Sequence, residues 1–147
     1  EEAGLDRLPQ GWRDAVKDMA TGSKLDHGDG SLEQRRRVLM GRAMKDLRGQ
    51  VRAIDLLSRF GGDEFVIVLL HADARASYEV CTRIRTALRN TFFLKDKGLE
   101  IKITGCFGIS GFPKNGNTVD DLIRKADIAM YEIKHMGKDG IKIYEGD

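Results

Sequence analysis

The sequence predicts an α+β domain in which helices flank an antiparallel-rich central sheet. Three observations predict this class. Apolar residues recur at helical spacing in several segments, two apolar runs flank a short glycine-containing turn, and further short apolar runs follow. The 147 residues are 41% hydrophobic and 33% charged, which is enough for residues 1–147 to bury the core of a single domain.

The first half of the chain supplies a helix and a hairpin. A helix is expected over Leu32–Gln50, with one apolar face formed by Leu39, Ala43, Met44 and Leu47. Strands are expected at Leu56–Phe60 and Phe65–Leu70, joined by the turn Gly61–Glu64. The segment 21–31 is rich in Gly, Ser and Asp and predicts a loop.

The second half supplies two more helices and two strands. A helix is expected over Asp73–Asn90, with an inward stripe of Ser77, Val80, Cys81, Ile84 and Leu88. The pattern then predicts a strand at Ile101–Ser110, with glycines at 105 and 108 where a close approach to the backbone is expected. A capping box at Thr118 opens a helix to Lys134 that buries Leu122, Ile123, Ala126, Met130 and Ile133, and residues 141–144 form a strand.

The overall charge excludes some partners. The 25 basic and 23 acidic residues give a net charge of +2, too balanced to indicate nucleic-acid or membrane binding by bulk electrostatics. Any anion site must therefore be local, and no nucleic-acid partner is expected. The histidines His27, His71 and His135 have no metal-ligand spacing.

Cellular setting follows from the cysteines and the apolar runs. Cys81 and Cys106 fall inside an expected helix and strand, as small core residues of a reducing compartment do. No apolar run reaches the roughly 20 residues that span a bilayer. A cytoplasmic domain is expected, either free or as part of a membrane-associated receptor. The chain lacks an initiator Met, so an excised part of a longer protein is expected.

The turn of the hairpin carries the most informative residues. Asp63 and Glu64 are adjacent carboxylates that repel each other, so a nearby cation would be favourable. Hard oxygen ligands with an open approach suit Mg²⁺ together with substrate phosphates. Gly61 and Gly62 leave room for a nucleotide against the backbone. The alternative is a solvated acidic turn with no ligand.

Five ordered motifs resemble the GGDEF family, the diguanylate cyclases that condense two GTP into cyclic di-GMP. In chain order they are "GDGSL", "RAID", "RFGGDEF", "ITGCFGIS" and "ADIAMYEIKHMGKD". The resemblance extends from about Gly28 to Tyr144. It implies a ferredoxin-like, nucleotidyl-cyclase-like fold with a GGDE hairpin, in a family-like region 28–147 that follows an atypical segment 1–27. It also implies a role in bacterial signalling.

The resemblance implies roles for the hairpin turn. Asp63 and Glu64 would bind Mg²⁺ (or Mn²⁺) and assist deprotonation of the ribose 3′-hydroxyl, and Gly61 and Gly62 would let GTP lie against the hairpin. Asp29 matches the Asp that accepts hydrogen bonds from guanine.

Two lysines complete the implied substrate site. Lys134 and Lys138 would hold the triphosphate, although the family usually has Arg where this chain has Lys138, so a two-pronged contact is lost. Compensation of a helix dipole explains the same lysines without a ligand.

The resemblance also implies an inhibitory, product-binding site. Arg52 and Asp55 match the family's Arg-x-x-Asp pair, and Arg83 lies where a supporting Arg often occurs. Arg can grip phosphate or guanine with two donors, while Asp accepts from guanine. An ordinary surface ion pair between Arg52 and Asp55, worth at most about 1 kcal/mol, is the alternative.

One departure bears on activity. Family members carry an apolar strand ending in an Asp-x-Asp run before the Gly-Asp motif, and residues 1–27 show no such strand. Either a segment is missing from the chain, or the domain is shortened and has lost a metal ligand, for which Asp26 is a weak substitute.

Three functions remain open. The first is a diguanylate cyclase that works as a homodimer and is attached to sensory or output domains. The second is a degenerate domain that senses cyclic di-GMP or GTP without catalysis. The third is a structural domain that transmits signals in a larger receptor.

Overall fold

The computed structural model describes residues 31–60, 64–98, 100–137 and 139–146. They divide between two compact units, each treated separately below. The first unit runs up to Leu70 and adds residues 92–101, and the second contains residues 71–91 and the chain from Lys102 onward. Among the residues described, no helix is both long and apolar enough to cross a membrane.

The described part of the first unit begins with helix α2, Ser31–Gln50, which packs on strand β1, Leu56–Arg59. The helix is buried at Met40, Ala43 and Leu47, which share one face because they are spaced by three and four residues. The predicted helix is confirmed. The buried face is rotated slightly from the predicted one, because Leu39 and Met44 are only half-buried.

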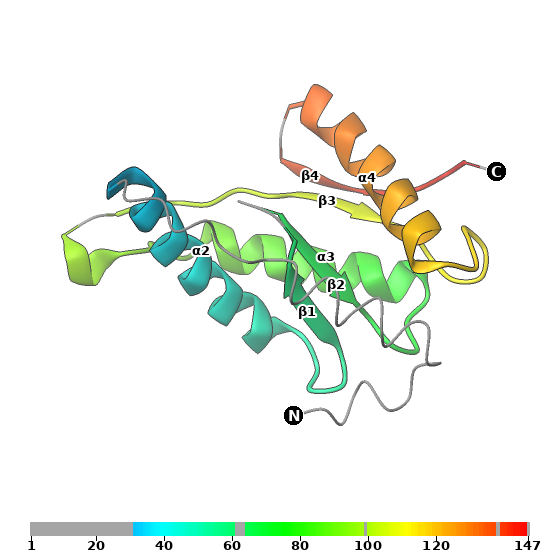
Figure 1. The fold of residues 1–147 in the computed structure, drawn as a ribbon, viewed down its shortest axis with the longest axis horizontal. Coiled ribbons are helices and arrows are strands. Elements are labelled where there is room, and N and C mark those ends of the chain that lie inside the picture. Colours follow the sequence, from blue (N-terminus) through cyan, green and yellow to red (C-terminus); the bar gives the residue numbers. More distant parts are fainter. Residues whose placement is uncertain (1–30, 61–63, 99, 138, 147) are drawn as a thin grey trace. The chain divides into compact units, whose positions relative to one another are not determined.

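Strand β1 pairs with strand β2, Phe65–Val68, as an antiparallel hairpin (Figure 1). The register runs from Leu56 opposite Val68 to Arg59 opposite Phe65. The predicted hairpin is confirmed, although both strands are shorter than expected. The first unit also contains the short 3₁₀ helix η2, Lys95–Lys97, enclosed by a bridge between Phe93 and Ile101.

The second unit begins with helix α3, Ala74–Arg89. The Asp73 side chain accepts a hydrogen bond from the backbone N–H of Ala76, so it caps the helix N-terminus, and Asn90 forms the other cap. The predicted helix bounds are therefore confirmed. Three residues of the predicted stripe are buried, namely Cys81, Ile84 and Leu88, while Ser77 and Val80 are half-buried.

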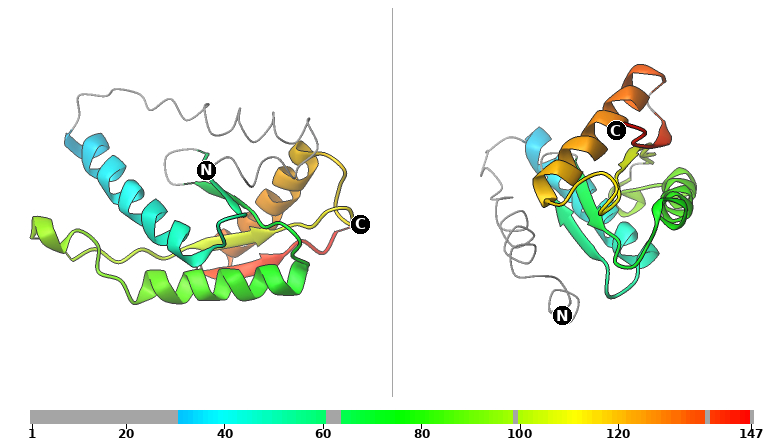
Figure 2. Two further views of the ribbon diagram at one scale, coloured as in Figure 1. Left: turned by 90° about the horizontal axis from the view of Figure 1, so that it is seen from below. Right: turned by 90° about the vertical axis from the view of Figure 1, so that its right-hand side faces the viewer.

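Strands β3, Cys106–Ile109, and β4, Gly140–Ile143, form a parallel pair in the second unit. Parallel neighbours need a long crossover, which helix α4, Val119–His135, supplies. The Thr118 side chain accepts from the N–H of Asp121, as its place in the predicted capping box requires. Figures 1 and 2 show the strand pair between α4 and α3, and both helices contact it.

The predicted strand at Ile101–Ser110 is wrong in its first half. Ile101 exchanges backbone hydrogen bonds with Phe93, at N–O distances of 2.8 and 3.1 Å, and the ladder with β4 begins only at Cys106. The sequence pattern is apolar at both places. The pattern therefore predicted one strand where the structure has two separate pairings, the bridge of Ile101 with Phe93 and the ladder of β3 with β4.

A close approach to the backbone, expected at the glycines of this segment, occurs at Gly108. A Cβ on Gly108 would lie 1.9 Å from the carbonyl oxygen of Ala126 and 2.7 Å from the nitrogen of Met130. The backbone of α4 itself fills the space beside β3. The predicted buried face of α4 is wrong in part. The small Ala129 is buried, whereas the five residues expected to be buried are only half-buried, namely Leu122, Ile123, Ala126, Met130 and Ile133.

The α+β class is confirmed. In the described ranges the four strands form two sheets of two strands, one antiparallel and one parallel. The parallel pairing was not expected from the sequence. The hairpin turn belongs to the first unit, and the lysine-bearing end of α4 belongs to the second.

Candidate functional site

The hairpin presents Glu64 at the edge of its turn. The Phe60 N–H donates to the Glu64 carbonyl oxygen at 2.8 Å, which extends the β1–β2 ladder by one step beyond Arg59 and Phe65. The two ends of the turn are thereby held together, and the Glu64 side chain is exposed. Gly61, Gly62 and Asp63 lie outside the described residues, so their predicted roles stay predictions.

The exposed Glu64 carboxylate fits a hard divalent cation in its chemistry. It offers oxygen ligands with open solvent around them, as Mg²⁺ requires when it keeps waters and substrate phosphates in its coordination shell. Within the described ranges, no group of three or more His, Cys, Asp or Glu side chains could hold a metal. Asp63, the second expected ligand, is not among those ranges.

The expected phosphate-binding residues are placed in part. Lys134 is exposed in the last turn of α4, next to His135, where the C-terminal end of the helix favours positive charge. Lys138 and the expected guanine-binding Asp29 lie outside the described residues. Of these three expected substrate-binding residues, the described ranges therefore include Lys134 alone.

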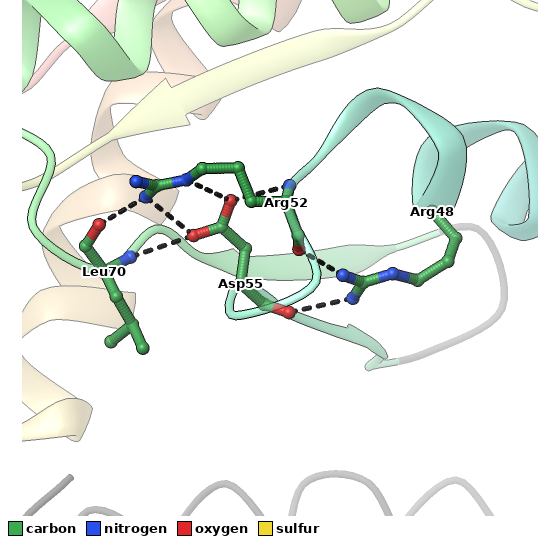
Figure 3. Close-up of polar contacts among 4 residues, drawn as sticks. All are labelled: Arg48, Arg52, Asp55 and Leu70. Carbon is green, nitrogen blue, oxygen red and sulfur yellow. Dashed lines mark hydrogen bonds and ion pairs between the residues drawn. The ribbon is translucent and has the colours of Figure 1, made fainter. Parts of the chain in front are cut away.

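The turn between α2 and β1 forms a compact polar site around Asp55 (Figure 3). One carboxylate oxygen of Asp55 accepts from the backbone N–H of Arg52 at 2.9 Å and from its Nε at 3.0 Å. The other accepts from Arg52 Nη2 at 2.9 Å and from the Leu70 N–H at 3.1 Å. Arg52 Nη2 also donates to the Leu70 carbonyl. The predicted pair is thus brought together, and it joins this turn to the end of β2.

Asp55 and Arg52 differ greatly in exposure. The Asp55 side chain is 2% exposed, whereas the Arg52 side chain is 52% exposed. Burial by itself would raise the pKa of Asp55, but hydrogen bonds from the Arg52 side chain and from the backbones of Arg52 and Leu70 lower it below its ordinary value. The Asp55 carboxylate is therefore ionised at neutral pH and has both oxygens occupied within the chain.

Arg48 is a residue of this site that the sequence reasoning missed. Its guanidinium donates to the Asp55 carbonyl oxygen at 2.8 Å and to the Arg52 carbonyl oxygen, as Figure 3 shows. Arg48 lies in the last turn of α2, so it links the helix end to both members of the pair. Its position in the sequence, four residues before Arg52, was the signal that could have indicated its part in this site.

Arg83, the third expected member of the inhibitory site, is an exposed residue of α3. It belongs to the second unit, whereas Arg52 and Asp55 belong to the first. Its predicted contribution to a shared site stays a prediction.

A second arginine–carboxylate cluster in the second unit was also missed. Asp139 accepts from Arg85 Nε at 2.8 Å and from Arg89 Nη2, and its backbone carbonyl accepts from Arg85 Nη2 at 3.3 Å. We call these three residues the Asp139 cluster. The two guanidinia lower the pKa of Asp139 to about 2. Nothing in the local sequence around Asp139 indicates partners 50 and 54 residues away.

The sequence matches the family model described as diguanylate cyclase, GGDEF domain, over residues 37–140. Diguanylate cyclase A of Treponema denticola is 26% identical over 106 residues, 72% of this chain and 28% of that protein. Diguanylate cyclase DgcP of Pseudomonas aeruginosa is 33% identical over 99 residues, 67% of this chain and 14% of that protein. The chain therefore spans less than a third of the length of these relatives.

Solved structures show the same fold. The crystal structure of the GGDEF domain of TpbB, also called YfiN, from Pseudomonas aeruginosa superposes with a TM-score of 0.72 at 23% identity. The match covers 97% of this chain and 94% of the other. At this identity the likeness supports the arrangement of helices and strands rather than any particular activity.

Proposed function

This chain belongs to the GGDEF family of diguanylate cyclases, and from that premise we propose that it condenses two GTP into cyclic di-GMP with Mg²⁺ (or Mn²⁺). The observation that carries the proposal is the hairpin with its ends paired at Phe60 and Glu64, which presents an exposed carboxylate within the matched region. A metal ion held by Asp63 and Glu64 would neutralise phosphate charge.

The residues of the chain have distinct proposed roles. Glu64 or Asp63 accepts the proton of the ribose 3′-hydroxyl, which attacks the α-phosphate of a second GTP and releases pyrophosphate. Gly61 and Gly62 accommodate the nucleotide, and Asp29 accepts hydrogen bonds from guanine. Lys134 and Lys138 bind the triphosphate. The exposed position of Lys134 in the last turn of α4 supports its part of this assignment.

The product explains why two copies of the domain are needed. Cyclic di-GMP contains two equivalent phosphodiester linkages, so two half-sites related by a two-fold axis form both bonds in the same way. We therefore propose a homodimer as the catalytic form. Attached sensory or output domains would bring the two copies together, in a cytoplasmic setting that suits the unbridged thiols Cys81 and Cys106.

Product inhibition is proposed at Arg52, Asp55 and Arg83. The exposed Arg52 guanidinium is the accessible donor for a guanine or phosphate of the product, because the Asp55 oxygens already accept hydrogen bonds from the chain. Product binding through Asp55 would require an exchange of those bonds. The variant Arg52→Ala would leave a buried carboxylate without its partner, so Arg83→Ala is the cleaner test of inhibition.

A second candidate function is a sensor that binds cyclic di-GMP without catalysis. The completeness of the Arg52–Asp55 pair within the described residues favours it as the alternative.

One experiment separates the two functions. The purified chain is incubated with GTP and Mg²⁺, and cyclic di-GMP and pyrophosphate are quantified by chromatography. The enzyme predicts two pyrophosphates per cyclic di-GMP, together with inhibition by product that Arg83→Ala relieves. The sensor predicts no product but saturable binding of cyclic di-GMP. Absence of both turnover and binding contradicts both functions.

A further inference from the structure

The Arg52 guanidinium has two edges that can each hold a carboxylate or a phosphate through two parallel hydrogen bonds. The edge formed by Nε and Nη2 is occupied by the Asp55 carboxylate, at N–O distances of 3.0 and 2.9 Å. The other edge is formed by Nη1 and Nη2. Because the Arg52 side chain is 52% exposed, this second edge is the one that remains for an anion from solution.

The second edge of Arg52 is itself half-occupied by the chain. Nη2 carries two protons, of which one is donated to Asp55 and the other to the backbone carbonyl of Leu70 (Figure 3). Within the described part of the chain, Nη1 donates to no group. An anion that binds both Nη1 and Nη2 must therefore take the Nη2 proton from the Leu70 carbonyl.

Leu70 is held by both of its backbone groups. Its N–H donates to the Asp55 carboxylate at 3.1 Å, and its carbonyl accepts from Arg52. Leu70 is also the last residue of the first unit before the chain enters the second unit at His71. The Arg52–Asp55 pair therefore holds the chain at the link between its two units. We call the form with the Arg52–Leu70 contact the latched form.

His71 has a backbone conformation that depends on this contact. Its φ is 55°, in the left-handed region that glycine adopts readily and that residues with a Cβ disfavour. This torsion adjoins the Leu70–His71 peptide bond, so it is coupled to the direction of the Leu70 carbonyl. Arg52 restrains the torsion by holding that carbonyl. A freed carbonyl would let His71 return to a more favourable φ.

We propose that the Leu70 carbonyl is an internal competitor for Arg52, and that an oxyanion bound by both Nη atoms displaces it and releases the Leu70–His71 link. This inference rests on the proposed product site, so the ligand is the phosphodiester of cyclic di-GMP. Part of its binding free energy is used to open the latched form. The stability of that form therefore sets the affinity, although residue 71 touches no ligand in this assignment.

Variants of residue 71 change the latched form without altering Arg52, Asp55 or Leu70. His71→Gly favours it, because glycine adopts the left-handed conformation freely. His71→Ala is the matched variant, since it also lacks the imidazole but keeps a Cβ. Calorimetry of the intact chain should give a Kd for cyclic di-GMP about five- to tenfold weaker in His71→Gly than in His71→Ala. Ala72→Gly, at a neighbouring residue without positive φ, should bind like the parent.

The carbonyl ¹³C resonance of Leu70 reports the displacement directly. Saturation with cyclic di-GMP should shift it in the direction that accompanies loss of a hydrogen bond, together with the Nη resonances of Arg52. Binding that leaves the Leu70 carbonyl resonance unchanged overturns the inference. Equal Kd values in His71→Gly and His71→Ala, or an equal weakening in Ala72→Gly, also overturn it.

Failure of the inference can be told apart from failure of the proposed function. Neither measurement uses GTP, so a chain without turnover still gives both readouts. If the parent binds no cyclic di-GMP, the proposed product site is refuted, and titration with inorganic phosphate then tests the competition alone. Phosphate should perturb the resonances of Arg52 Nη and the Leu70 carbonyl together. A response at Arg52 without one at Leu70, or no response at either, overturns the inference.

Discussion

The Arg52–Asp55 turn and the Asp139 cluster use the same chemical pair in opposite ways. In the first unit, Asp55 is 2% exposed and its arginine lies three residues away. In the second unit, Asp139 is 21% exposed and its arginines lie 50 and 54 residues away. The first arrangement builds a local turn, and the second holds two distant elements together.

This difference indicates where each unit should be sensitive to change. The Asp55 carboxylate accepts four hydrogen bonds, two of them from backbone N–H groups, so its loss should be felt mainly in folding. The Asp139 cluster joins the residue before β4 to α3, so its loss should be felt mainly in how firmly the start of β4 is held against α3. The second unit also depends on backbone contact between β3 and α4.

The largest effect is expected at that backbone contact. In Gly108→Ala the new Cβ would overlap the backbone of α4, so the free energy of unfolding should fall by about 3 kcal/mol or more. Gly41→Ala is the matched control, because Gly41 is exposed in α2 with nothing within 4 Å of a new Cβ. It should stabilise by about 0.5–1 kcal/mol. Urea denaturation measures both, and equal effects would refute the contact.

The next largest effect is expected at Asp55. Asp55→Ala leaves the N–H groups of Arg52 and Leu70 without their acceptor and should cost about 2–3 kcal/mol. Asp127→Ala removes an exposed carboxylate of α4 and should change stability by less than about 0.5 kcal/mol. The same denaturation experiment measures both. A small loss in Asp55→Ala would mean that the pair is the ordinary surface ion pair considered as the alternative.

Acid should expose the contribution of Asp139. Its pKa is about 2 in the folded chain and about 3.9 in an unfolded one, so its stabilising effect is present above about pH 4 and is lost as the pH falls toward 2. Asp139→Asn should therefore flatten this part of the stability–pH curve. The lowered pKa of Asp55 has the same sign and accounts for part of the remaining slope. A curve of unchanged slope in the variant would contradict the cluster.

The smallest effect is expected at Arg48. Arg48→Ala removes two hydrogen bonds to backbone carbonyls and should cost about 1 kcal/mol. Lys45→Ala, at an exposed position of the same helix, should have almost no effect. Thermal unfolding of the two variants side by side makes the comparison, and equal midpoints would remove Arg48 from the site.

The sequence was informative wherever a structure depends on neighbouring residues. The bounds of α3, the N-cap of α4, the β1–β2 hairpin and the closeness of Arg52 to Asp55 are all set within a few residues, and all were predicted. The burial of Asp55 was not, because it depends on Leu70, fifteen residues further along.

Features that join distant segments could not be predicted in the same way. The parallel pairing of β3 with β4 and the Asp139 cluster depend on how α4 returns the chain, which no local pattern specifies. The glycine pattern did predict a close approach at Gly108 but did not identify α4 as its cause. Of the candidate catalytic and substrate-binding residues, Glu64 and Lys134 lie in the described ranges, and every predicted role, theirs included, stays a prediction.

We propose that cyclic di-GMP is made from GTP at the hairpin turn. The most direct measurement is a phosphorus NMR time course of GTP and Mg²⁺ with the parent chain, with Glu64→Gln and with Glu100→Gln, an exposed control in the same unit. Pyrophosphate and cyclic di-GMP should form with the parent and the control, and at least about 100-fold more slowly with Glu64→Gln. Equal rates in all three, or no product from the parent, would contradict the claim.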